Sequence, residues 1–333
     1  MKKLTALALV LFALFGLFQG ALAQQAPTFS REQLDALAAA LLDENSELII
    51  GDEFRVQVSE DDLSVTPGLD KDWVNILLLG TDTGSAQLNY GRTDTMLILS
   101  VNRATGKMRL ASLVRDMYVD IPHLAVRNRI NTANAFGGPL YAIKVVNETF
   151  GLNITDYASV NFTGFKDIVD KLGGVTLSMS IAEAKIAGAQ YTTEPQLLNG
   201  EQALEYVRIR KLDNNFGRNS RQRILLDALL RKVLSGSDLT QIMAALTETL
   251  RHLTTNMSIN EVLQLVPAVI KSNEEMDMAG FPASGDYHNA MINGVMMRKA
   301  FLFSAPVSPR MFSIWWWKAM MQTVAISTNR PRR

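Results

Sequence analysis

The chain has 333 residues, of which 47% are hydrophobic, and its 33 basic side chains balance its 33 acidic ones. This length and composition suit one large domain or two with a substantial apolar core, and the zero net charge indicates no particular class of partner. The absence of cysteine excludes disulfides, cysteine-ligated zinc and thiol nucleophiles, and His123, His252 and His288 have no metal-type spacing.

The first 23 residues resemble a secretory signal. Lys2 and Lys3 precede an apolar run over residues 4–18, and Ala21-Leu22-Ala23 has the small-x-small pattern of a cleavage site. The run is shorter than the roughly 20 residues that span a bilayer comfortably. An uncleaved membrane anchor is the alternative, and both interpretations place the folded part outside the cytoplasm.

Residues 24–72 are predicted to be an accessory lead-in to the main domain. A capping box at Ser30 indicates a helix to about Leu42, and residues 53–58 alternate like an edge strand. Residues 30–72 carry 12 acidic and 3 basic side chains, a net charge of −9. The lead-in could therefore pair with a basic segment elsewhere in the chain.

Three strands are predicted at the start of the main domain, over residues 74–79, 95–101 and 107–114. Residues 102–106 between the second and third have hairpin turn chemistry. If the first strand is antiparallel to the second, three strand ends with charged residues share one edge of the sheet. These residues are Asp82 after the first strand, Arg92 and Asp94 before the second, and Arg115 and Asp116 after the third. Such an edge is suited to an anion, with or without a metal.

Helices and strands alternate after residue 116, which predicts an α/β fold with a mixed central sheet flanked by helices. Helices are expected over residues 139–150 and 163–172, and strands over residues 157–161 and 175–179. One face of the second helix is apolar and is either an ordinary core face or part of a pocket wall. Its residues are Phe165, Ile168, Val169 and Leu172.

Residues 208–232 carry 8 basic and 2 acidic side chains, a net charge of +6. Arg208 and Arg210 project to the same side if the backbone there is extended. Arg218, Arg221 and Gln222 share one face at the start of a long helix. Cations in a first helical turn oppose the helix dipole, whereas a bound phosphate or pyrophosphate would reverse that effect. Pairing of these arginines with the acidic lead-in is the alternative.

Several motifs in this order resemble the LytR-CpsA-Psr family, over roughly residues 73–234. They are Gly80-Thr81-Asp82, Gly91-Arg92-Thr93-Asp94, Leu113-Val114-Arg115-Asp116, Asn161-Phe162-Thr163-Gly164-Phe165 with Gly173-Gly174-Val175, the run from Asn199 to Arg210, and Phe216-Gly217-Arg218 with Arg221 and Gln222. The resemblance implies an extracytoplasmic α/β domain with an apolar pocket for a polyprenyl chain and a charged mouth for its phosphates.

The resemblance also implies roles for individual residues. Asp82 and Asp94 would hold Mg²⁺ or Mn²⁺ and, with Arg115, form the catalytic group. The apolar face of residues 163–172 would line the lipid pocket. The pyrophosphate-binding residues would be Arg92, Arg115, Arg208, Arg210, Arg218, Arg221 and Gln222.

The function implied by the resemblance is transfer of a phosphoglycan from a polyprenyl-pyrophosphate carrier to peptidoglycan or a similar wall polymer at the membrane surface. Two alternatives stay open: a polyprenyl-phosphate binding protein without turnover, and a pyrophosphatase acting on the same lipid. Nucleic acid is not an expected partner, because no helix-turn-helix or basic recognition helix occurs.

Two features depart from the family pattern. Asn215 stands where an acidic residue is usual, with Asp213 two positions earlier. Residues 236–300 are predicted to be a helical C-terminal part of the main domain, residues 73–235. Residues 301–333 form an atypical tail, expected to be poorly ordered or, because of Trp315-Trp316-Trp317, to lie at an interface.

Overall fold

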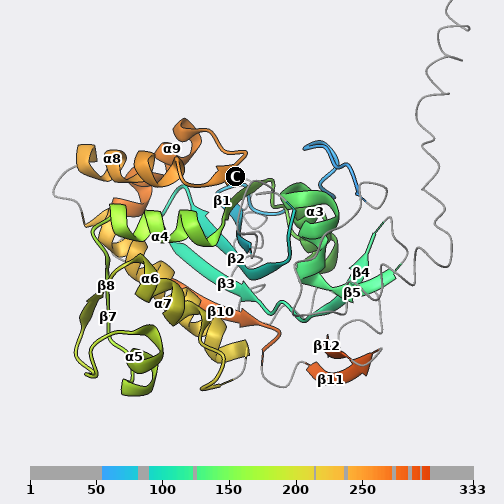
Figure 1. Cartoon of the computed structure of the whole chain (residues 1–333). Helices are drawn as coiled ribbons and strands as arrows, with labels where there is room; N and C mark the ends of the chain where they lie inside the picture. Colours follow the sequence, from blue (N-terminus) through green and yellow to red (C-terminus); the bar gives the residue numbers. More distant parts are fainter. Residues whose placement is uncertain are drawn as a thin grey trace, which may run out of the picture. The chain divides into compact units, whose positions relative to one another are not determined.

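A computed structural model describes residues 55–81, 90–122, 126–213, 215–235, 239–271, 275–283, 287–292 and 295–300, and all of them belong to one unit, residues 41–333. A six-stranded sheet runs through this unit in the order β10-β3-β2-β1-β6-β9 (Figure 1). Its strands are β1 (Trp73–Thr81), β2 (Thr93–Asn102), β3 (Met108–Leu113), β6 (Asp156–Val160), β9 (Thr254–Thr255) and β10 (Asp277–Phe281).

The sheet is mixed, as predicted from the sequence. β2 is antiparallel to both β1 and β3, whereas β6 and β10 run parallel to their neighbours β1 and β3. The β2–β3 turn forms because the Asn102 side chain accepts hydrogen bonds from the backbone amides of Ala104, at 3.1 Å, and Thr105, at 2.9 Å. The antiparallel arrangement of β1 and β2 brings the predicted charged strand ends to one edge.

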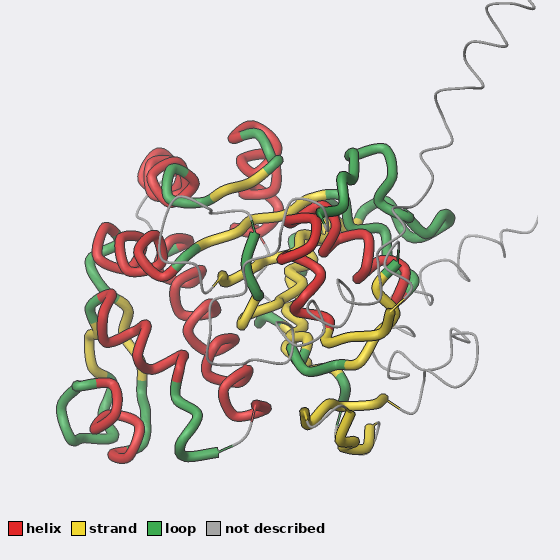
Figure 2. Tube along the Cα trace, turned by 45° about the vertical axis from the view of Figure 1, so that its right-hand side comes forward, coloured by secondary structure: helices red, strands yellow, loops and turns green. Residues whose placement is uncertain are grey.

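Helices cover both faces of the sheet, on opposite sides in Figure 1 and in the turned view of Figure 2. The helices that the structure describes are α3 (Ala133–Phe150), α4 (Phe162–Lys171), α5 (Ile181–Ala187), α6 (Gly200–Arg208), α7 (Asn215–Leu234), α8 (Leu239–Leu250) and α9 (Ile259–Lys271), with the 3₁₀ turn η2 (Ile130–Thr132). α3 lies on one side, and α4, α6 and α7 on the other. Alternate residues of β1, such as Ile76 and Leu77, therefore face different helical layers.

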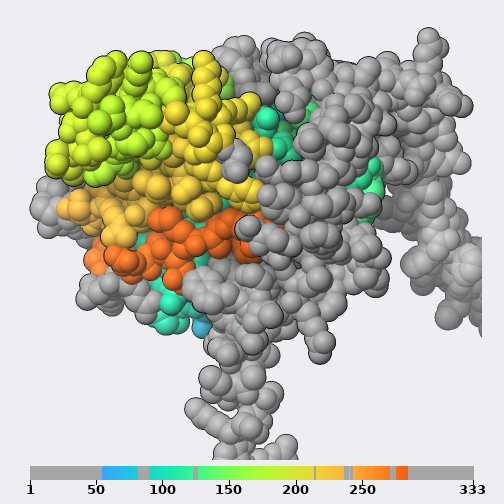
Figure 3. Space-filling model, turned by 90° about the horizontal axis from the view of Figure 1, so that it is seen from below, coloured from blue at the N-terminus to red at the C-terminus, as the bar shows by residue number. Residues whose placement is uncertain are grey.

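Among the described residues, three two-stranded antiparallel sheets lie outside the main sheet. They are β4 (Tyr118–Ile121) with β5 (Val126–Arg129), β7 (Val175–Leu177) with β8 (Gln196–Leu198), and β11 (Tyr287–Ile292) with β12 (Val295–Ala300). β7, β8 and α5 form a small lobe beside α6 and α7, which is yellow-green in the view from below in Figure 3. The same view shows β10, in orange, at the surface next to α7.

The division between residues 24–72 and the main domain stays a prediction, and the described part of these residues contacts that domain. Residues 55–72 pack on α3: Lys144 Nζ lies 2.6 Å from the Asp62 carboxylate, and Asn147 Nδ2 donates to the Leu63 carbonyl at 2.8 Å. Residues 55–58 also form no strand. Instead of pairing within a sheet, this irregular stretch is held to α3 by its backbone, because the Val56 amide donates to the Phe136 carbonyl at 2.9 Å.

The prediction of residues 236–300 as helical is only half correct. α8 and α9 are helices, but β9 and β10 join the central sheet and β11 and β12 pair with each other. Residues 1–23 and 301–333 lie outside the described residues. In the part of the chain that the structure describes, no helix has the length and hydropathy required to cross a bilayer.

Candidate active site

Asp94, at the start of β2, lies at the centre of a group of arginines. Arg115, which follows β3, places Nη1 2.5 Å from Asp94 Oδ1. Arg210, which follows α6, donates from Nη2 to Asp94 Oδ2. Arg218, in the first turns of α7, donates to the Asp94 backbone carbonyl at 3.4 Å. Four segments of the chain thus meet at the sheet edge that the sequence indicated.

Asp94 is ionised in this environment. Burial is the largest single effect on its carboxyl group and raises the pKa, but the charges of Arg115, Arg210 and Arg218 together outweigh burial. The pKa of Asp94 is therefore lowered from its usual value. A carboxylate with a lowered pKa is a weak base, so this geometry suits holding arginines better than removing protons.

Arg218 is a buried cation, with 2% of its surface exposed. Its Nε and Nη1 atoms are buried and have no hydrogen-bond partner among the described residues. Burial, followed by repulsion from Arg115 and Arg210, lowers the pKa of Arg218 to about 10, and the attraction of Asp94 and Asp116 only partly compensates. Unsatisfied guanidinium donors of this kind are ready to bind an oxyanion.

Arg208 is the last residue of α6, so the extended backbone that would project Arg208 and Arg210 to the same side is not present at Arg208. Its guanidinium carbon lies 4.7 Å from the centre of the Phe162 ring, and Nη1 lies 3.3 Å from Glu205. The Asn199–Gln202 capping box fixes the start of α6, and the helix ends after Arg208, where Ile209 has a non-helical ψ of 123°. Phe162 is a site residue that the sequence analysis missed.

A cavity of about 1040 Å³ opens beside this charged group. Its lining consists of a polar group around Asp94, here called the mouth, and a larger group, here called the interior, that is almost all apolar. The polar group comprises Asp94, Asn161, Glu205, Arg208, Arg210, Lys211, Arg218 and Gln222. The apolar lining comes from β1, β2 and β6 of the sheet and from α4, α6, α7 and α8 around it.

Three of the four predicted pocket residues line this cavity: Phe165, Ile168 and Leu172. Val169 is not among the lining residues, because it lies on another side of α4 and packs in the core with residues such as Val175 and Leu198. The sequence analysis missed the larger contribution of α7, which lines the cavity with a series of leucines and Val233. The leucines are Leu225, Leu226, Leu229 and Leu230. Their spacing of three and four residues was the available signal.

The predicted pyrophosphate-binding residues do not all gather at the mouth. Arg208, Arg210, Arg218 and Gln222 line the cavity, and Arg115 is joined to them through Asp94. Arg92 is 4% exposed and is not among the lining residues. Arg221 pairs with Asp213 and Glu183 instead, as described below. Asp82 lies outside the described residues.

Within the described ranges, no group of three or more acidic or histidine side chains is placed to hold a metal ion. Both oxygens of Asp94 are engaged by arginines. Asp116 is 3.3 Å from Arg115 Nε and accepts a hydrogen bond from the amide of Asn215. The side-chain amide of Asn215 thus contacts Asp116 directly.

The LytR_cpsA_psr family model matches residues 43–301. The polyisoprenyl-teichoic acid–peptidoglycan teichoic acid transferases TagU of Oceanobacillus iheyensis and Enterococcus faecalis are 42% and 34% identical to the chain over 181 and 198 residues. These matches cover 52% and 59% of this chain, and 55% and 65% of the relatives, less than two thirds of each. A solved structure of TagT bound to LIIa-WTA has the same fold, with a TM-score of 0.62, 24% identity, and coverage of 81% of this chain and 100% of that one.

Proposed function

Because the chain belongs to the LytR-CpsA-Psr family, we propose that it transfers a phosphoglycan from a polyprenyl-pyrophosphate carrier to peptidoglycan or a similar wall polymer. The observation that carries this proposal is an arginine-rich mouth on an apolar cavity of about 1040 Å³. The names of the relatives specify a polyisoprenyl-linked teichoic acid as donor and peptidoglycan as acceptor. We extend that class of donor and acceptor to this chain and place its action outside the cytoplasm, next to the membrane.

The cavity interior is suited to the polyprenyl chain. Its lining from α4, α7 and α8 is aliphatic and aromatic, and each methylene group buried from water contributes about 0.8 kcal/mol. A carrier lipid would enter with its chain between these helices and the sheet. Its pyrophosphate would then stay at the mouth, beside Asp94.

The mouth is suited to the pyrophosphate. Arg208, Arg210 and Arg218 would bind its oxygens, and Gln222 would orient it. Since Arg115, Arg210 and Arg218 repel one another across Asp94, an added anion would relieve that repulsion. The same charges would stabilise the leaving phosphate, which is the main requirement of phosphoryl transfer.

The proposed reaction is a displacement at phosphorus. A hydroxyl oxygen of the acceptor forms a new bond to the phosphorus that carries the glycan, and the bond from that phosphorus to the polyprenyl phosphate breaks with its electron pair. The acceptor proton leaves with a base. Asp94 has a lowered pKa and holds two arginines, so Asp82 is the better candidate for the base.

Mg²⁺ or Mn²⁺ is part of the proposal through Asp82 and Asp94. Asp94 fits a metal in charge, since it is ionised and its side chain is 27% exposed, but each of its oxygens already contacts a guanidinium. Asp82 would have to supply further oxygen ligands. When bound, the ion would neutralise charge on the pyrophosphate. Asp82 and Asp94 would be supported as metal ligands if transfer by the wild type requires the metal ion and if both Asp82→Asn and Asp94→Asn lose this transfer.

The test combines native mass spectrometry with a transfer assay. The purified protein should carry a long-chain isoprenoid phosphate, and it should move a phosphoglycan to wall polymer unless Arg115 is replaced by alanine. Bound lipid with no product would indicate the binding protein, and release of polyprenyl phosphate without acceptor would indicate the pyrophosphatase. Unchanged transfer by folded Arg115→Ala would overturn the proposed site.

A further inference from the structure

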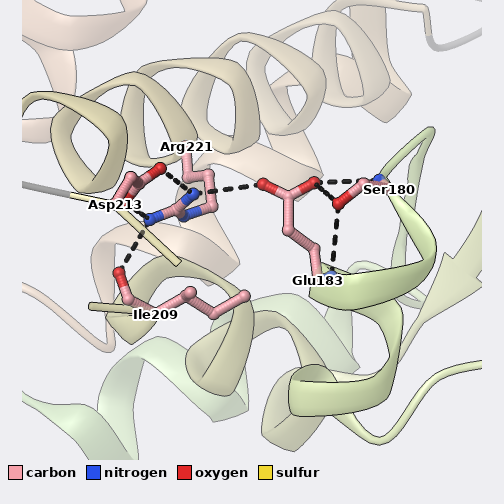
Figure 4. A network of polar contacts seen from close by, with 5 residues as sticks. All are labelled: Ser180, Glu183, Ile209, Asp213 and Arg221. Carbon is pink, nitrogen blue, oxygen red and sulfur yellow. Dashed lines mark hydrogen bonds and ion pairs between the residues drawn. The ribbon is translucent and has the colours of Figure 1, made fainter. Parts of the chain in front are cut away.

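Arg221 has the most complete set of partners of the arginines on α7 described so far. Its two terminal nitrogens form a bidentate pair with Asp213, at 2.8 and 2.7 Å. Nη2 also donates to the Ile209 carbonyl at 2.8 Å, and Nη1 donates to Glu183 at 3.1 Å (Figure 4). With a side chain only 5% exposed and its terminal nitrogens engaged, Arg221 is poorly placed to bind a phosphate.

These contacts fix both ends of the loop that carries Arg210. Residues 209–213 connect α6 to α7 and form neither helix nor strand. Arg221 binds Ile209 on one side of Arg210 and Asp213 on the other. The position of Arg210 against Asp94 therefore depends on Arg221, which lies about one turn after Arg218 on α7.

Gly217 makes room for this arrangement. A Cβ atom at residue 217 would lie 1.9 Å from Asp213 Oδ2, so the carboxylate occupies the space that any other side chain would need. Asp213 also lies beside the N-terminal end of α7, where a negative charge is favoured by the helix dipole. The glycine thus allows Asp213 to reach Arg221.

Glu183 provides a fixed point outside the loop. Its Oε2 atom accepts hydrogen bonds from the Ser180 amide and hydroxyl, at 2.9 and 2.8 Å, in the capping box of α5. Its Oε1 atom accepts the hydrogen bond from Arg221. The small lobe that contains α5 is thereby joined to the loop, as Figure 4 shows.

We propose that Arg221 is a positioning residue, which together with Asp213, Gly217 and Glu183 holds residues 209–213 so that Arg210 meets Asp94 at the cavity mouth. The consequence for ligand binding rests on the proposed function. The effect of Arg221 on the order of the loop does not rest on the proposed function, so loop order and ligand binding can be tested separately.

Hydrogen exchange of the full chain tests the loop. In Arg221→Met and Gly217→Ala, the backbone amides of residues 209–213 should exchange at least about tenfold faster than in the wild type, while β1 and β2 keep their protection. Arg231→Met is the matched control, because Arg231 lies on the same helix, is exposed and pairs only with Asp227 among the contacts described. Unchanged exchange in the loop of both variants would overturn the proposal.

Binding of geranylgeranyl diphosphate, a short polyprenyl diphosphate, tests the link to Arg210. Arg221→Met should weaken binding about tenfold, the size expected for loss of one charge-assisted hydrogen bond, and Arg221→Lys should recover part of it. The double variant with Arg210→Ala should bind no more weakly than Arg210→Ala alone. Additive losses would show that Arg221 acts by another route. A wild-type protein that does not bind this probe would contradict the proposed function, and the exchange experiment would still decide the role of Arg221.

Discussion

The arginines at the cavity mouth together carry more positive charge than the neighbouring carboxylates neutralise. Arg115, Arg210 and Arg218 surround Asp94, and Asp116 is shared between Arg115 and Asn215. Burial and mutual repulsion of cations destabilise a folded protein unless a ligand compensates. The mouth is therefore expected to trade stability for affinity, and Arg218 is the residue at which this trade can be measured.

Replacing Arg218 with methionine should stabilise the folded protein while it slows the proposed transfer. The substitution removes a buried cation whose pKa is lowered to about 10, so we expect the free energy of unfolding to rise by on the order of 1 kcal/mol. Transfer should fall by roughly 100-fold or more, because the guanidinium no longer stabilises the leaving phosphate. Denaturant unfolding and a transfer assay on the same preparation measure both effects.

Arg221→Met is the comparison for that experiment. It leaves Asp213 and Glu183 without their cation, so it should lower the free energy of unfolding, where Arg218→Met raises it. A loss of stability in Arg218→Met as large as in Arg221→Met would mean that Arg218 is a structural residue and not a binding residue.

Asp94 gives the site a dependence on pH that follows from its lowered pKa. Its ionised form stabilises the folded state at every pH above the value of the unfolded chain, about 3.8, and this contribution is lost as the pH falls through the lower folded-state pKa. Asp94→Asn should therefore reduce the free energy of unfolding at pH 7 by about 1–3 kcal/mol. The difference from the wild type should shrink below about pH 4.

Unfolding curves of both proteins between about pH 3 and pH 7 test this expectation. Asp227→Asn serves as the control, since Asp227 pairs with the exposed Arg231 and should change stability by well under 1 kcal/mol. A difference between wild type and Asp94→Asn that grows on acidification would show that folding raises the pKa of Asp94 instead of lowering it.

Among the elements, α4 and α6 form one wall of the cavity, and they touch at Gly200. A Cβ atom there would lie 2.4 Å from the Lys166 carbonyl oxygen and 2.7 Å from its Cα, both backbone atoms of α4. The Gly200 amide also donates to Asp170 on α4 at 2.7 Å. The glycine thus sets how closely the two helices approach.

Gly200→Ala should separate the two helices and disturb the cavity. Because backbone atoms cannot move aside as a flexible side chain can, we expect a loss of about 2 kcal/mol or more in the free energy of unfolding. Binding of a long polyprenyl phosphate should weaken as well. Glu201→Ala, which removes an exposed pair with Lys166 one residue later, should change the stability by less than about 1 kcal/mol. Equal stability of the two variants would show that the contact is not rigid.

Elements whose signals are local could be predicted from the sequence, and those that depend on distant partners could not. The β2–β3 hairpin, the capping box of α6 and the N-cap of α4 are encoded within a few residues of the chain, at Asn102, Asn199 and Asn161. β10 was missed because its five residues have no clear alternation, and its partner β3 lies more than 160 residues away, as the contact between Ser112 and Ala279 shows.

The same distinction applies to the site. Spacing placed Arg218, Arg221 and Gln222 on one helical face, and two of them do line the cavity. Arg221 differs because a long side chain can reach past its own face, and its choice of Asp213 depends on a loop whose path the sequence does not specify. The spacing of residues along a helix predicts which face of the helix a residue occupies, but not which carboxylate an arginine on that face will pair with.

For the unit as a whole, the mixed sheet explains why mouth and cavity are neighbours. The strand ends of β2 and β3 bring Asp94 and Arg115 to one edge, while the face of β1, β2 and β6 continues inward as the floor of the cavity. α7 spans both regions, with Arg218 and Gln222 at the mouth and its leucines deeper inside. A single amphiphilic ligand would therefore contact the charged and apolar parts together.

A phenylalanine side chain placed on the cavity floor should distinguish the contribution of the apolar cavity to ligand binding from that of the charged mouth. Ala158 on β6 pairs with Leu78 on β1 and lines the cavity, so Ala158→Phe would fill part of its volume without touching the arginines. Affinity for a long polyprenyl diphosphate should fall by roughly tenfold or more, whereas affinity for inorganic pyrophosphate should not change. Calorimetric titration of both ligands measures the difference. If both affinities fell equally, the loss would come from the shared pyrophosphate group, because inorganic pyrophosphate has no chain that reaches the cavity floor. The apolar cavity would then not be where the chain of the lipid binds.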